Sequence, residues 1–152
     1  MRMSRADERH DITIDEYIAS LSDETTKNDS HTLYEIMRRI SGEEPILYGI
    51  GTIGFGVFKY EYQSGRKGES HTLGFYPRNN KITIYLTDGT KRYNDFLLLL
   101  GKHSTTGYCL YIRRLSDIEL PVLVTILEKS YENITMKSQH GPLRQIPWQD
   151  ER

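Results

Sequence analysis

Apolar residues recur with a helical period near the start of the chain. Their spacing of i, i+3, i+4 and i+7 predicts a short amphipathic helix. The stripe consists of Ile14, Tyr17, Ile18 and Leu21. Residues 13–16 read Thr-Ile-Asp-Glu, which is typical of a capping box at a helix start. Residues 33–40 carry a second apolar stripe, and Gly42 is expected to end that helix.

Between residues 46 and 87 the apolar period changes from helical to two, which predicts strands with two different faces. Short polar segments at residues 64–68, 78–80 and 88–89 interrupt this pattern and contain glycine or asparagine, as turns do. Loops of this length connect antiparallel strands. We therefore expect an antiparallel meander in the middle of the chain.

The remaining pattern predicts a short helix over residues 93–100 and a last strand over 108–112. Residues 116–119 read Ser-Asp-Ile-Glu, a second capping-box sequence, and an amphipathic helix is expected to follow it. From Asn133 onward the chain is polar, and we expect a loose tail that contains Trp148.

These elements place helices at both ends of the chain and strands between them. We expect a flexible N-terminus over residues 1–12, one domain over 13–132 and a polar tail over 133–152. The fold class that follows is α+β: a two-layer sandwich, in which helices from both chain ends pack on an antiparallel sheet of about five strands.

Composition argues against some classes of function but does not identify one. The 152 residues include 20 basic and 21 acidic side chains, for a net charge of -1. This balance argues against a nucleic-acid partner, because such proteins usually carry a basic excess. The single cysteine, Cys109, favours a reducing compartment. No signal sequence or membrane-spanning run is apparent, so we expect a cytoplasmic protein with no membrane partner.

Five short blocks resemble the YdhG-like family of domains of unknown function. They lie at residues 64–68, 74–78, 84–86, 100–103 and 109–112. The resemblance implies a frataxin-like fold, and one bacterial member of the family is described as a frataxin-like iron chaperone. The chain departs from the family pattern at Tyr48-Gly49-Ile50, where relatives have Trp-Gly-Pro. It also lacks the lysines that relatives carry within residues 104–107.

Cationic groups in the predicted loops form the leading candidate site. Arg66, Arg78, Lys102 and His103 stand at strand or helix ends, and Tyr111 lies in the strand that follows. Arginine forks and free backbone N–H groups suit a phosphate or carboxylate. The same residues are also typical of ordinary solvated turns. The leading hypothesis is a non-enzymatic binding module for a small anionic ligand.

Acidic residues in the predicted N-terminal helices are the second candidate site. Asp15, Glu16, Asp23 and Glu24 offer the oxygen ligands that hard cations prefer. No certain cofactor follows, but iron is possible, and the family resemblance makes an iron chaperone the alternative function. These acids lack a ligand spacing, and they also suit helix starts, where negative charge is favourable.

A weak enzyme built on Cys109 and His103 is the third hypothesis, because both lie near one loop–strand junction. A free cysteine in a strand is more often a small buried hydrophobe. Residues 49–54 spell G-x-G-x-x-G, but they precede a strand and not a helix, so the nucleotide-loop interpretation fails. The many tyrosines of the strands could stack bases, although a sheet core explains them better.

Overall fold

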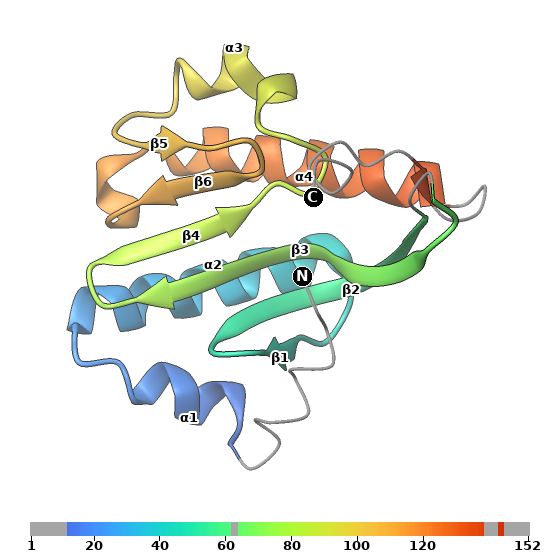
Figure 1. Ribbon diagram of the computed structural model, residues 1–152. Coiled ribbons are helices and arrows are strands. Elements are labelled where there is room, and N and C mark those ends of the chain that lie inside the picture. Colours follow the sequence, from blue (N-terminus) through green and yellow to red (C-terminus); the bar gives the residue numbers. More distant parts are fainter. Residues whose placement is uncertain (1–11, 62–63, 139–142, 145–152) are drawn as a thin grey trace.

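The computed structural model describes residues 12–61, 64–138 and 143–144 (Figure 1). Its elements are α1 (Ile14–Ala19), α2 (Glu24–Ser41), β1 (Ile46–Tyr48), β2 (Thr52–Glu61), β3 (Lys67–Arg78), β4 (Lys81–Tyr85), η2 (Lys91–Tyr93), α3 (Asn94–Leu97), β5 (Ser104–Thr105), β6 (Cys109–Ile112), η3 (Leu115–Asp117), α4 (Leu120–Ser138) and β7 (Leu143–Arg144). Residues 1–11 of the expected flexible N-terminus and Trp148 lie outside the described residues, whereas Ile12 is described and packs against the core.

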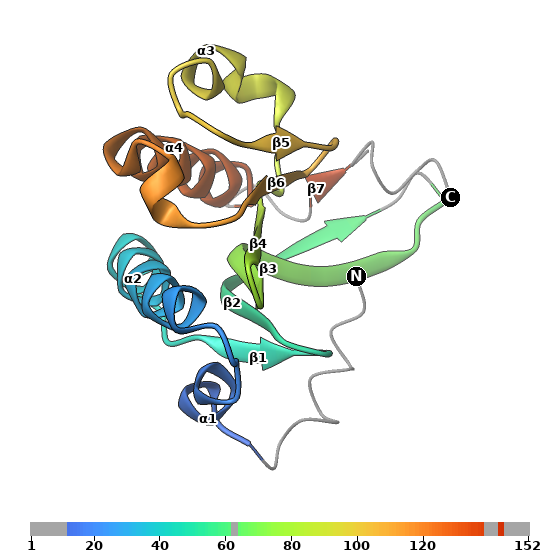
Figure 2. The same ribbon diagram turned by 90° about the vertical axis from the view of Figure 1, so that its left-hand side faces the viewer.

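The strands form one sheet in the order β1-β2-β3-β4-β6-β5, with β7 pairing β2. Neighbours on the main path are antiparallel, and β7 runs parallel to β2. The helices α1, α2 and α4 lie on one side of the sheet, seen most clearly from the side (Figure 2). The predicted α+β architecture, with helices from both ends of the chain on an antiparallel sheet, is confirmed.

The core lies between the sheet and the two long helices. Alternate residues of the strands point into it, because successive side chains of a strand face opposite sides. The sheet side of this core includes Phe55, Leu73, Phe75, Ile82, Ile84 and Leu110, which are all fully buried. Leu33 and Met37 of α2 and Leu123 of α4 close it from the helix side.

The first capping box is formed as predicted. Glu16 N donates to Thr13 Oγ1 at 3.0 Å, and Thr13 N donates to Glu16 Oε1 at 2.8 Å. Gly42 ends α2 with a left-handed φ of 68°, a conformation that glycine adopts without steric cost. Local sequence therefore determines both ends of this helical region.

The second capping box does not form. Residues 115–117 make a short 3₁₀ turn, and α4 begins only at Leu120. The reason is tertiary: Glu119 N donates to Leu100 O at 2.7 Å, and Lys102 N donates to Asp117 O at 3.1 Å. These bonds join the segment to the loop before β5 and outweigh the local helix signal.

Four further elements differ from the predictions. The helix expected over 93–100 is shorter, because α-helical geometry covers only Asn94–Leu97. α4 continues to Ser138 with Ile134 buried, so the domain boundary expected at residue 132 falls within a helix. The two-residue strands β5 and β7 were not predicted, since such short pairings leave no periodic pattern.

No described helix has the length and apolarity needed to cross a membrane.

Candidate functional site

The hairpin between β3 and β4 positions the strongest candidate residues. Arg78 and Lys81 form its last cross-strand pair, and Asn79 and Asn80 make the turn. Asn80 adopts a positive φ of 65°, which asparagine tolerates better than most residues. The structure therefore places Arg78 in a strand, at the end of the sheet.

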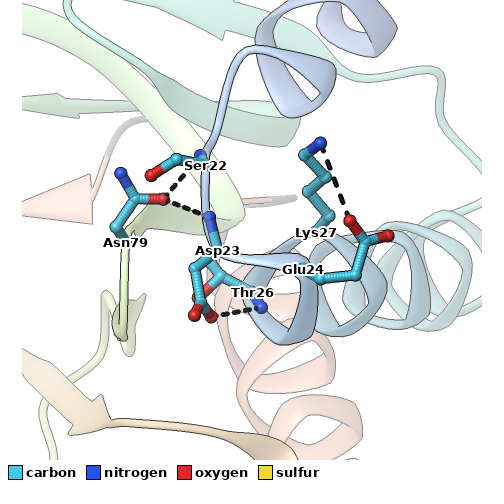
Figure 3. Close-up of polar contacts among 6 residues, drawn as sticks. All are labelled: Ser22, Asp23, Glu24, Thr26, Lys27 and Asn79. Carbon is cyan, nitrogen blue, oxygen red and sulfur yellow. Dashed lines mark hydrogen bonds and ion pairs between the residues drawn. The ribbon is translucent and has the colours of Figure 1, made fainter.

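The same turn is fastened to the start of α2 (Figure 3). Asn79 Oδ1 accepts hydrogen bonds from the backbone N–H groups of Ser22 and Asp23, both at 2.9 Å. Asn80 N donates to Thr26 Oγ1 at 3.0 Å. Three hydrogen bonds thus hold the turn against the start of α2, and the side chains beside it stand on a fixed support.

A row of polar and aromatic residues crosses the sheet next to this turn. In register, Tyr76 pairs with Thr83, Thr83 with Tyr111, and Tyr111 with Ser104. Their strand neighbours point into the core, so this row faces the other way. No helix of the described residues covers this surface, which we call the helix-free face; on it stand Tyr76, Arg78, Lys81, Thr83, Tyr85, Cys109 and Tyr111.

Two cations lie along this row and contact its aromatic rings. Arg78 Nη2 donates to Thr83 Oγ1 at 2.7 Å, and Arg78 Cζ lies 4.7 Å from the centre of the Tyr76 ring. Lys81 Nζ lies 4.9 Å from the centre of the Tyr111 ring. The hydroxyl of Tyr111 is 3.3 Å from Thr106 Oγ1, which steadies the ring.

Neither cation has an acidic partner among the described residues. Other cations of the chain do: Arg38 pairs with Glu44, and Arg92 pairs with Asp88. Arg78 is half-buried, and its Nε atom is buried without a hydrogen-bond partner in the described part of the chain. Since a partly desolvated charge is costly unless it is paired, this arrangement favours an anion.

The structure separates Arg66 from the other predicted residues. Arg66 precedes β3 in the hairpin loop, whereas Arg78 ends that strand. A strand rises about 3.3 Å per residue, so the length of β3 puts roughly 40 Å between them. Arg66 therefore belongs to no common site with Arg78.

Lys102 and His103 lie just before the edge strand β5, which is three strands away from the Arg78 strand β3 in the sheet. Lys102 is exposed, and its backbone is tied to Asp117. The His103 Nδ1 atom lies 2.8 Å from Gly101 O, so the ring contacts the backbone of its own loop.

Of the five predicted ligand-binding residues, the structure brings together Arg78 and Tyr111. Lys81 and Thr83, which link them, were missed.

The acidic residues proposed for iron serve the helix starts. Glu16 completes the first capping box, and Asp23 accepts from Thr26 N and Thr26 Oγ1 at 2.9 and 2.7 Å. The bonds from Thr26 lower the pKa of Asp23. Glu24 lies 3.8 Å from Lys27 Nζ (Figure 3). Asp15 lies in the first turn of α1, where the helix dipole favours it.

No group of three or more metal-ligating side chains is found among the described residues. The four acids are divided between two helix starts, and three of them already have hydrogen-bond or ion-pair partners. Their arrangement is explained by helix capping, and iron binding at this position stays a prediction.

The pair proposed for catalysis is not assembled. Thr106 N donates to Cys109 O at 3.0 Å, so Cys109 lies opposite Thr106, three residues along the chain from His103. At strand spacing this amounts to roughly 10 Å. Cys109 is half-buried on the helix-free face, and not fully buried as expected of a core cysteine.

A buried imidazole on the helix-free face was not singled out from the sequence. His71 is 2% exposed, and both ring nitrogens are buried without a hydrogen-bond partner in the described part of the chain. Its ring centre lies 5.9 Å from that of Tyr48 and 5.2 Å from that of Tyr85. Burial lowers the pKa of His71 to about 4 and raises the pKa of Tyr48 to about 12.

Two glycines make room for this ring cluster. A Cβ atom at Gly54 would lie 2.5 Å from the Tyr48 ring, and one at Gly74 would lie 2.9 Å from the His71 ring. Gly54 and Gly74 are direct cross-strand partners, which only the register reveals. No periodicity of the sequence could have shown that these positions meet.

Comparison with known proteins finds no matching family model, no similar curated protein and no similar solved structure. The resemblance to YdhG-like domains therefore stays a prediction, and the function must be argued from the site.

Proposed function

We propose that this protein is a non-enzymatic binding module that holds a small anionic ligand on the helix-free face of the sheet. The observation that carries the proposal is the half-buried guanidinium of Arg78, which has a neutral hydroxyl and an aromatic ring as partners and no described carboxylate. Lys81, the neighbouring cation, is likewise without a described acidic partner.

The chemistry of this pair suits a phosphate or carboxylate group. Arginine presents a planar fork of donors that matches such oxyanions, and lysine adds a mobile point charge. Thr83 can keep its bond to Arg78 and so fix the fork. The anchored turn between Arg78 and Lys81 limits how far the two charges can separate.

A thermal melt with and without phosphorylated compounds tests this proposal. A ligand at a hundred times its dissociation constant stabilises the fold by about 2.7 kcal/mol. For a chain of this size, that corresponds to a rise in midpoint of about 5–10 °C. We expect this rise with a sugar phosphate and none with the same sugar lacking the phosphate.

The variants Lys81→Ala and Arg78→Gln are expected to lose the rise. Lys67→Ala serves as the matched control, because Lys67 is an exposed lysine at the other end of β3. An unchanged rise in both site variants would place the anion elsewhere. The absence of a rise with every phosphorylated compound tested would contradict the proposal as a whole.

A further inference from the structure

The helix-free face offers aromatic surface directly beside the two cations. Tyr76, Tyr85 and Tyr111 come from three adjacent strands, β3, β4 and β6, and each is half-buried. Tyr76 packs against Arg78 and Tyr85 against His71, whereas the ring of Tyr111 has the mobile Lys81 ammonium beside it. The position of this ring beside the cations therefore indicates that the ligand carries a further group besides its anion.

Lys81 links the cationic and the aromatic part of the surface. It is the cross-strand partner of Arg78, and its ammonium group lies 4.9 Å from the centre of the Tyr111 ring. The Tyr111 hydroxyl is held near Thr106, so the ring keeps its place when the lysine moves. A phosphate bound by Arg78 and Lys81 would thus lie within one side chain's reach of a fixed aromatic ring.

We infer that the ligand is a mononucleotide, whose phosphate pairs with Arg78 and Lys81 and whose base stacks on Tyr111. This inference rests on the proposed function. Every base has a flat π-surface that stacks on tyrosine, and this stacking is stronger than an exposed cation–π contact. The base can therefore displace the Lys81 ammonium from the ring and release it to the phosphate.

The overall charge favours a single nucleotide over a strand. A groove for single-stranded nucleic acid follows the backbone with many cations, whereas this chain has a net charge of -1. The unpaired charges at the Arg78–Lys81 pair match one phosphate group. The balanced charge therefore disfavours a nucleic-acid strand and is compatible with a single nucleotide.

Binding calorimetry on the full chain separates the contributions of phosphate and base. The probes are ribose 5-phosphate, adenosine 5′-monophosphate, cytidine 5′-monophosphate and adenosine. We expect both nucleotides to bind at least tenfold more tightly than ribose 5-phosphate, and adenosine to bind weakly. In Tyr111→Leu this tenfold difference between the nucleotides and ribose 5-phosphate should disappear.

Tyr111→Phe provides the second variant, because it keeps the ring and loses only the hydroxyl. It should retain most of the nucleotide preference even if the leucine variant folds poorly. Loss of the preference in Tyr111→Phe would overturn the stacking role. Equal affinity of the wild type for ribose 5-phosphate and the nucleotides would overturn the inference and leave the proposed function intact.

Two other results would each have a distinct meaning. If neither ribose 5-phosphate nor a nucleotide binds, the proposed function itself fails. If a single-stranded decanucleotide binds more than a hundredfold more tightly than the mononucleotides, the face serves a nucleic-acid strand and the inference is overturned.

Discussion

His71 lies in surroundings that disfavour its charged form. The imidazole is buried between two tyrosine rings, and neither nitrogen has a described partner that could stabilise a proton. Burial in a medium of low polarity disfavours a cation, which is why the pKa of His71 falls to about 4. The residue therefore couples the stability of the fold to pH.

The sign of this coupling follows from the two states. In the unfolded chain the imidazole takes up a proton near pH 6.5, whereas the folded protein takes it up only near pH 4. The unfolded state binds more protons between these values, so the free energy of unfolding declines as pH falls from 6.5 to 4. A shift of this size corresponds to about 3 kcal/mol.

Urea unfolding of the wild type and of His71→Phe at pH 7.5 and at pH 4 measures this effect. We expect the wild type to lose about 3 kcal/mol more than the variant between the two pH values. Any packing cost of the larger ring is present at both pH values and cancels. His31→Phe, on the exposed side of α2, is the control and should follow the wild type. Parallel pH profiles for wild type and His71→Phe would contradict the assignment.

At the scale of elements, Asp88 connects three parts of the fold. Its carboxylate accepts hydrogen bonds from Tyr93 in η2 and from Ser130 and Asn133 in α4. The Asp88 side chain is 4% exposed, and Arg92 lies 3.5 Å away as its ion-pair partner. Burial and the neighbouring carboxylate raise the pKa of Tyr93, so its hydroxyl stays a donor. This carboxylate attaches the middle of α4 to the turn after β4.

We expect Asp88→Ala to lower the free energy of unfolding by about 3 kcal/mol, because it leaves several buried donors without an acceptor. Arg92→Ala removes only the half-exposed partner and should cost less than about 1 kcal/mol. Chemical denaturation of both variants at neutral pH gives the comparison. A larger loss in Arg92→Ala than in Asp88→Ala would show that the ion pair matters more than the hydrogen bonds.

The ends of helices were predictable from the sequence where interactions between neighbouring residues determine them. The first capping box and the glycine at the end of α2 are local signals, and both are found in the structure. The box at residues 116–119 fails because Glu119 bonds to Leu100, a residue nineteen positions earlier in the chain. A local pattern cannot report such a partner, so tertiary contacts decide which helix signals are realised.

The candidate site was only partly predictable for the same reason. Arg78 was recognised by its charge at a turn, and Tyr111 by its place in the last strand. Lys81 and Thr83 were missed because their importance depends on register, which sets them between those two residues. Arg66 was included because it resembles Arg78 in sequence context, although the length of β3 separates them. The sequence shows which residues are cationic, but only the fold determines which of them lie close together.

At the scale of the whole molecule, α2 and α4 share one core although they come from opposite ends of the chain. Leu33 of α2 and Leu123 of α4 are both fully buried within that single cluster. If either helix detached from the sheet, the same face of the sheet would become exposed to water. Folding should therefore be one cooperative transition, as is usual for a single domain of this length.

Leu33→Ala and Leu123→Ala test this cooperativity from the two ends. Each should cost about 3 kcal/mol, the typical loss for a buried leucine. Far-UV circular dichroism reports the helices, and near-UV dichroism reports the packing of the tyrosines. If the core is one unit, both signals shift together by the same amount in either variant, because removing packing at one end weakens the structure at the other. Separate transitions in Leu123→Ala would instead show that α4 unfolds independently, and the helix-free face would then rest on the β2–β3–β4 meander and α2 alone.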